Sequence, residues 1–214
     1  MAAVVGLAAL AGCAEKAGDV ESKDRSARLQ GVRQLAAEDS AEAVARIERA
    51  ASHPDALTAI EAVRVLGASP RPQARQALRK VIAEEPRAPV RREAVIFLGQ
   101  RPKDRVGDED LEVLRRVVVR DPDPRVRSDA AAALGTVGGL ADVKLLVDVA
   151  TTDEDLLVQS RAVRAIEDLL DLRFKYDSKA PAAEREAALR RVRDLAPAIA
   201  EKYMRHHPKG RTGP

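Results

Sequence analysis

Short apolar segments with a period of three to four residues alternate along the chain with polar turns that contain proline, aspartate or glycine. In the segment just before residue 121, for example, the apolar positions are Leu111, Val113, Leu114, Val117 and Val118. This spacing predicts an amphipathic helix, which the Asp-Pro-Asp-Pro turn at residues 121–124 ends. Asp123 is expected to accept hydrogen bonds from the free N–H groups of the following helix, and Pro124 is expected at the first position of that helix. The chain is therefore predicted to consist of helix–turn–helix units.

One such unit is copied along the chain. The pattern V-R-x-x-A-x-x-x-L-G fits residues 90–99 and 126–135 without a mismatch, and weaker copies begin at residues 27, 58 and 158. The five starts are 31, 32, 36 and 32 residues apart. A helical unit repeated at such intervals predicts a solenoid, in which each unit packs against its neighbours. The predicted fold class is all-α, a right-handed α-solenoid of helix pairs over residues 22–170 with a C-terminal capping helix.

The helix that carries each copy, called the template helix below, has one wide apolar arc. Its fifth template position is Ala or Gly in every copy, so neighbouring backbones are expected to approach closely there. The glycines that close three copies are expected to end their helices in the left-handed conformation. These glycines are Gly67, Gly99 and Gly135.

An arginine interrupts the apolar arc at the second template position of three copies. These residues are Arg28, Arg91 and Arg127. A cation at such a position must be paired. The V-R-x-x-A-x-x-x-L-G unit resembles short bacterial HEAT-like repeats, a kind also found in phycobilin lyases, and the resemblance covers residues 22–170. It implies that this arginine joins a ladder of polar contacts between adjacent repeats.

Acidic residues in the turns are candidate partners for that ladder. They are Asp121, Asp123 and Asp155. Ala59 and Gln159 replace the arginine in two copies, which argues against a continuous ladder.

The region after the last copy, residues 171–205, departs from the repeat. A helix is expected from Pro181 to about Tyr203, bent or broken at Pro197. The segment before it is similar to a C-terminal extension of some bacterial HEAT-repeat proteins, although Lys175 and Ser178 replace a Gly and a Pro of that motif. We predict a capping extension whose aromatic residues bury the last apolar face of the solenoid, followed by a basic tail at residues 206–214.

The first residues indicate export. Residues 2–12 are apolar and uncharged, too short to cross a bilayer as a helix but typical of the core of a secretory signal, although no Lys or Arg precedes them. Leu-Ala-Gly-Cys at residues 10–13 resembles the lipobox of bacterial lipoproteins, which implies a signal peptide at residues 1–12 and lipidation of Cys13. Residues 13–21 are then a tether, and the expected location is the cell envelope, lipid-anchored and facing the periplasm or exterior. The alternative is an Ala-rich first helix with a buried thiol.

Composition argues against several functions. Aromatic residues are 2% of the chain and Trp is absent, which leaves few stacking surfaces for bases or flat cofactors. Lys plus Arg number 37 and Asp plus Glu 34, so the charges are close to balance. The single cysteine excludes an internal disulfide, and three histidines do not supply a convincing zinc site. We find no catalytic grouping, so the sequence predicts a protein that is not an enzyme and takes no metal, cofactor or small-molecule substrate.

The remaining candidate site is the outward arc of the template helices, expected to line the concave side of the solenoid. It mixes arginine, acidic and aliphatic residues, which suits a protein or peptide partner better than a phosphate backbone. The predicted partner-binding residues are Arg33, Arg64, Arg92 and Arg164. Two alternatives stay open: a nucleic-acid-binding protein like the HEAT-like DNA glycosylases, and a chromophore or enzyme-assisting module of the phycobilin-lyase kind.

Overall fold

The computed structural model describes residues 20–38 and 40–206, which form ten α-helices and two short 3₁₀ helices. In chain order the α-helices are α1 (Arg25–Glu38), α2 (Ala41–Ala51), α3 (Ala56–Ala68), α4 (Pro72–Glu84), α5 (Ala88–Gly99), α6 (Asp108–Arg120), α7 (Pro124–Val137), α8 (Val143–Thr152), α9 (Leu156–Leu170) and α10 (Ala182–His206). The 3₁₀ helices are η1 (Lys103–Arg105) and η2 (Leu140–Asp142). The all-α prediction is confirmed.

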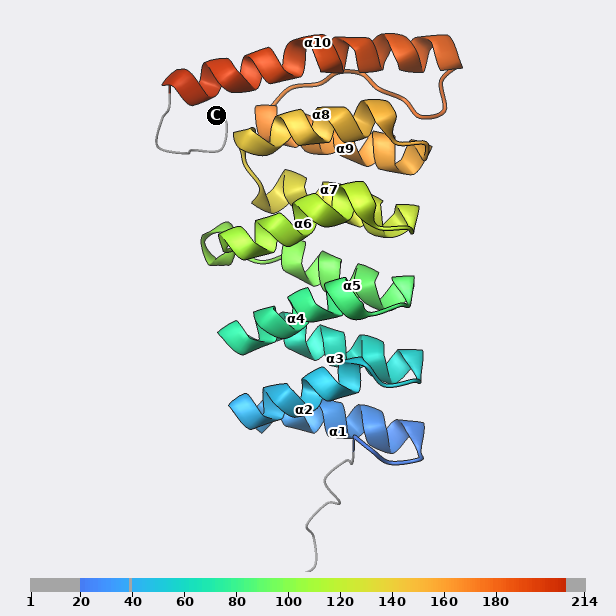
Figure 1. The fold of residues 1–214 in the computed structure, drawn as a ribbon, viewed down its shortest axis with the longest axis vertical. Coiled ribbons are helices and arrows are strands. Elements are labelled where there is room, and N and C mark those ends of the chain that lie inside the picture. Colours follow the sequence, from blue (N-terminus) through green and yellow to red (C-terminus); the bar gives the residue numbers. More distant parts are fainter. Residues whose placement is uncertain (1–19, 39, 207–214) are drawn as a thin grey trace, which may run out of the picture.

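The helices stack as antiparallel pairs along one axis, and α10 lies across the end of the stack (Figure 1). The template helices α1, α3, α5, α7 and α9 pack against one another in succession. The helices that precede them, α2, α4, α6 and α8, form a second layer in which neighbours touch far less. We call these four the first helices. The array is therefore a two-layered solenoid, as the copied unit predicts.

Caps and small residues explain why each unit folds locally. Asp123 Oδ1 accepts from the N–H of Arg125 at 2.8 Å, and Pro124 occupies the first turn of α7, as expected. Asp55 and Asp155 cap α3 and α9 in the same way. The fifth template position is buried in every copy, and so is the aliphatic residue four positions later. Small side chains thus form the seam between template helices, while Leu and Ile fill the space behind it.

The left-handed conformation predicted for the three glycines is wrong, although α5 does end at Gly99. The backbone of Gly67, Gly99 and Gly135 is helical, and α3 and α7 continue past theirs. A Cβ on Gly135 would lie 2.8 Å from the Cα of Ala165 in α9, and one on Gly99 would lie 2.8 Å from the Cα of Ala133 in α7. These glycines are therefore required for close helix approach and not for a left-handed turn.

The C-terminal extension closes the array as predicted. Phe174 is buried, and its backbone N–H donates to Glu167 Oε1 at 2.7 Å, a carboxylate at the template position where the better copies have glycine. The hydroxyl of Tyr176 donates to Gln159 Oε1 at 2.9 Å. Helix α10 then packs on α8 and α9 through Ala and Val side chains. It continues through Pro197, so the expected break is absent, and the helix reaches His206.

Some predictions fall on residues outside the described part of the chain. Cys13, the signal peptide at residues 1–12 and residues 207–214 of the tail are among them. Val20, at the end of the predicted tether, is buried against the solenoid. None of the helices between residues 20 and 206 combines the length and the hydropathy that crossing a bilayer requires.

Candidate functional site

Arg91 makes a buried, two-pronged ion pair with the next repeat. Its Nε and Nη2 donate to the two carboxylate oxygens of Asp121 at 2.9 and 2.8 Å. Its Nη1 donates to the carbonyls of Glu85 and Pro86 at 3.0 and 2.8 Å. The two side chains are 9% and 6% exposed. Arg91 therefore ties its own helix–turn–helix unit to the following one, with its hydrogen-bonding groups satisfied as a buried cation requires.

The other two predicted structural arginines act in the same way. Arg127 pairs with Asp153 at 2.8 and 2.9 Å, and Arg28 donates to Thr58 and Asp55 at 3.2 Å each. Of the candidate partners, Asp121 is confirmed. The predictions for Asp123 and Asp155 are wrong, because their carboxylates cap the helices that follow them.

The ladder continues through both copies that lack the arginine. Beside Ala59, Nη1 of Arg87 reaches back from the next repeat and donates to the carbonyls of His53 and Pro54 at 2.9 and 3.0 Å. These carbonyls correspond to those that Arg91 binds in its own repeat. In the last copy, Gln159 donates to the carbonyl of Asp153 at 2.7 Å. The polar contacts therefore run from α1 to the C-terminal extension.

The ladder favours the charged forms of its members. The hydroxyl of Thr58 and the guanidinium of Arg28 lower the pKa of Asp55 to about 2. The pKa of Asp153 is also lowered: burial is the largest single effect and would raise it, but the hydrogen bonds from Arg127 and from the N–H of Asp155, together with the charge of Arg127, outweigh burial. The pKa of Arg91 is raised by its hydrogen bonds to Asp121. These groups are ionised throughout the neutral range.

The predicted partner-binding arginines lie on the surface of the template helices, and each forms an ion pair. Arg33 pairs with Glu61 at 2.6 Å, Arg64 with Glu93 at 2.6 Å, and Arg92 with Asp129 at 2.8 Å, in each case across to the next repeat. Arg164 pairs within α9, with Asp168 at 3.2 Å. We call this outward arc of the template helices the template face. The four predicted arginines are paired with acids, so the face does not form a uniform positive track.

Apolar side chains accompany these ion pairs. Ile60 and Ile96 are half-buried on the template face. Leu57, Leu156 and Leu157 are 40–52% exposed where α3 and α9 begin. Each of these leucines lies in the first turn of its helix, directly after a capping turn. Their place in the first turn is the sequence signal that could have identified them as exposed apolar residues. Charged and aliphatic groups are thus interleaved, which is typical of surfaces that bind proteins.

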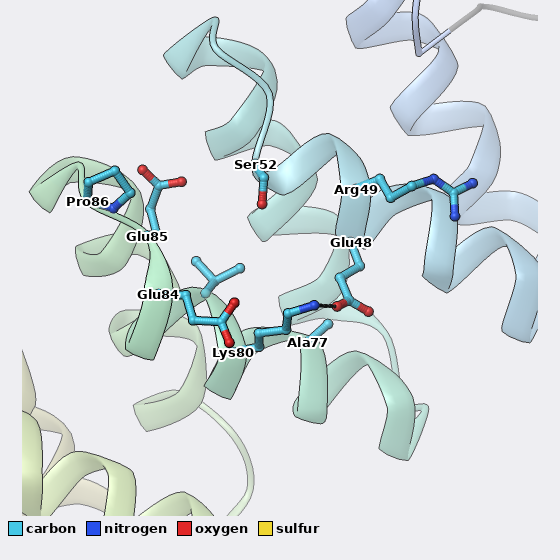
Figure 2. Close-up of a pocket in the computed structure, with 9 residues that line it drawn as sticks. Glu48, Arg49, Ser52, Ala77, Lys80, Glu84, Glu85 and Pro86 are labelled. Carbon is cyan, nitrogen blue, oxygen red and sulfur yellow. Dashed lines mark hydrogen bonds and ion pairs between the residues drawn. The ribbon is translucent and has the colours of Figure 1, made fainter.

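Grooves lie between first helices of adjacent repeats, where that layer is loosely packed. One, of about 410 Å³, lies between α2 and α4, and Lys80 Nζ binds Glu48 Oε1 across it at 2.9 Å (Figure 2). A second, of about 520 Å³, lies between the C-terminal parts of α4 and α6. A third, of about 600 Å³, lies between the N-terminal parts of the same two helices. Sequence reasoning missed these grooves, because the walls of each come from helices of different repeats. We call the second of them the groove between α4 and α6.

Potential metal ligands do not cluster in the part of the chain that the structure describes. Those residues contain no group of three His, Cys, Asp or Glu side chains arranged to hold a metal ion. His53 accepts a hydrogen bond from the N–H of Asp55 at 3.0 Å and so belongs to a turn. His206 contacts the carbonyl of Lys202 at the end of α10.

Comparison with known families gives two overlapping matches. The family model described as HEAT repeats matches residues 19–99 and residues 82–167. Together the matches span α1 to α9 except the last three residues of α9. No curated protein sequence matches the chain.

Proposed function

Since the chain belongs to the HEAT-repeat family, we propose that it is a non-catalytic scaffold that binds another protein or peptide on the concave, template face of its solenoid. The observation that carries this proposal is the composition of that face. Charge-balanced ion pairs alternate there with half-buried aliphatic side chains over several consecutive repeats. Extended surfaces of this kind are what stacked repeats commonly use for binding.

The ladder beneath the face supports the same function. Arg28, Arg91 and Arg127 each join two consecutive repeats, so the relative positions of the template helices are fixed before a partner arrives. A surface held in its binding geometry loses less conformational entropy on association. The acids that hold Arg33, Arg64 and Arg92 also orient those side chains for a partner.

The two alternatives have weaker support. A nucleic-acid backbone needs cations without carboxylate partners, whereas three of the four predicted partner-binding arginines are neutralised by the next repeat. A bilin-binding module needs a pocket with aromatic or nucleophilic groups, and the chain has two Phe and two Tyr. A salt-dependent mobility shift with DNA, or an absorbance change on mixing with a bilin, would favour these alternatives instead.

We also propose that the protein is exported and anchored by a lipid on Cys13, because residues 10–13 resemble a lipobox. One acyl chain binds a bilayer reversibly, whereas the two or three chains of a lipoprotein anchor it stably. The expected result is that labelled palmitate enters the wild type expressed in bacteria and that Cys13→Ala carries no label and leaves the membrane fraction. Label that persists in the variant, or a wild type found in the cytoplasm, would contradict the anchor.

The partner-binding proposal is tested by site-specific crosslinking of the full chain. A photoreactive residue placed at Arg64, which is 55% exposed, should capture a discrete partner from the membrane fraction. Arg64→Glu, which places two acids side by side, should reduce capture from a neighbouring probe site by about tenfold. A probe at Lys144, an exposed position of α8, is the matched control. Equal capture from both positions would show that the template face is not the binding surface.

A further inference from the structure

We propose that the groove between α4 and α6 is a second binding site, which takes an acidic amphipathic helix of a partner protein. Its apolar floor consists of Ile82, Val113 and Val117. Arg116 and Arg120 line it on the α6 side, and Glu84 lines it on the α4 side. A volume of about 520 Å³ accommodates several side chains from one ridge of a helix.

The repeat itself shows what is unusual about this groove. Glu48, Lys80 and Arg116 occupy the same position of α2, α4 and α6, ten residues before each copy start. In the groove between α2 and α4, the ion pair of Lys80 with Glu48 spans the two walls (Figure 2). The corresponding pair one repeat later is Arg116 with Lys80, which are both cations. The groove between α4 and α6 therefore lacks a bridge at this position, although Arg79 joins the two helices nearer the start of α6, where it binds Glu109 and Asp110 at 2.6 Å each.

The two arginines that α6 contributes to this groove also lack ion-pair partners elsewhere in the described part of the chain. Arg116 and Arg120 are exposed and form no ion pair within residues 20–38 and 40–206. By contrast, the adjacent Arg115 binds Asp142 at 2.6 Å. Arg116 and Arg120 are four residues apart on one helix face, where like charges repel. Carboxylates from another molecule would relieve that repulsion.

Apolar groups next to these cations define the rest of the ligand. The floor formed by Ile82, Val113 and Val117 is aliphatic. A bound helix would fill the groove with its own aliphatic side chains. Helices that bind grooves use apolar residues spaced three or four positions apart, and acidic residues beside them would meet Arg116 and Arg120.

Acidic residues on the α4 side of the groove make this choice of ligand more specific. Glu84 faces the groove from α4, and the carboxylates of Glu85 and Asp121 lie at its end, held by Arg87 and Arg91. A polyanion such as a nucleic-acid backbone would be repelled along that side. An amphipathic helix with acids on one flank only satisfies both walls, which is why we choose a protein ligand over a phosphate one.

The test uses the full chain and a designed peptide as the probe. The acidic peptide is a helical 16-mer with leucines four residues apart and glutamates along one flank, and its twin has lysine in place of each glutamate. Fluorescence anisotropy should show the acidic peptide binding at least tenfold more tightly than its twin. R116E/R120E should lose at least tenfold in affinity for the acidic peptide and gain affinity for the lysine peptide.

A matched variant separates the groove from general electrostatics. R125E/K144E changes the net charge by the same amount at exposed positions outside the groove, and should change the affinity less than twofold. Circular dichroism confirms that both variants fold. Equal losses in the two variants, or no binding of the acidic peptide, would overturn the proposal. Either result leaves crosslinking at the template face unaffected, so this site and the proposed function fail separately.

Discussion

Arg91→Ala is expected to lower the free energy of unfolding by about 3 kcal/mol, the lower end of the range for breaking a buried ion pair. The variant leaves the carboxylate of Asp121 unpaired at 6% exposure, and removes the donor from the carbonyls of Glu85 and Pro86. The uncompensated charge contributes most of the loss, because a buried carboxylate that has given up its water would keep only the hydrogen bond from the N–H of Asp123. Urea unfolding followed by circular dichroism measures the effect.

The sequence neighbour supplies the control. Arg92 also pairs with an acid of the next repeat, Asp129, but its side chain is 36% exposed. Arg92→Ala is therefore expected to cost no more than about 1 kcal/mol. Arg91→Lys keeps the charge but loses the fork geometry and should fall between the two. If Arg91→Ala is no more costly than Arg92→Ala, the buried ladder does not stabilise the solenoid.

Arg91→Ala should also change how the solenoid unfolds. The ion pair between Arg91 and Asp121 joins α5 to the turn before α7, near the middle of the array. In repeat proteins, stability is approximately a sum of terms for single units and for the interfaces between neighbours. Weakening a central interface should broaden the urea transition or separate it into two steps.

Gly99→Ala is expected to lower the free energy of unfolding by about 1–2 kcal/mol, although alanine is the better helix former by about 1 kcal/mol. The added Cβ would overlap the Cβ of Ala133 and lie 2.8 Å from its Cα. Since Cα belongs to the backbone, no rotamer change relieves the contact, and α5 and α7 must move apart. Thermal or urea unfolding of the variant tests this expectation.

Two further variants make the result specific. Gly139→Ala adds the same methyl group where no atom lies within 4 Å and where the backbone is extended, so it should be close to neutral. Ala133→Gly in the Gly99→Ala background removes one of the two overlapping atoms and should restore part of the lost stability. A Gly99→Ala variant as stable as the wild type would show that the template helices can separate at little cost.

The sequence by itself determined the period, the helical units and their caps. These features are local, because proline and aspartate act on the N–H groups of the next turn, as Asp123 does on Arg125. It also identified the arginines of the ladder, because a cation within an apolar arc requires a partner wherever the helix packs. Its lipid anchor and partner-binding face remain predictions.

Only the tertiary structure decided which groups meet. The sequence could not show that Arg87 reaches back to the carbonyls beside Ala59, since its neighbours there are some 33 residues away. It suggested the wrong role for Gly99, because a left-handed turn and a close helix contact both favour glycine and only the position of Ala133 distinguishes them. The groove between α4 and α6 likewise depends on the spacing of two helices from different repeats, which packing sets and no local pattern encodes.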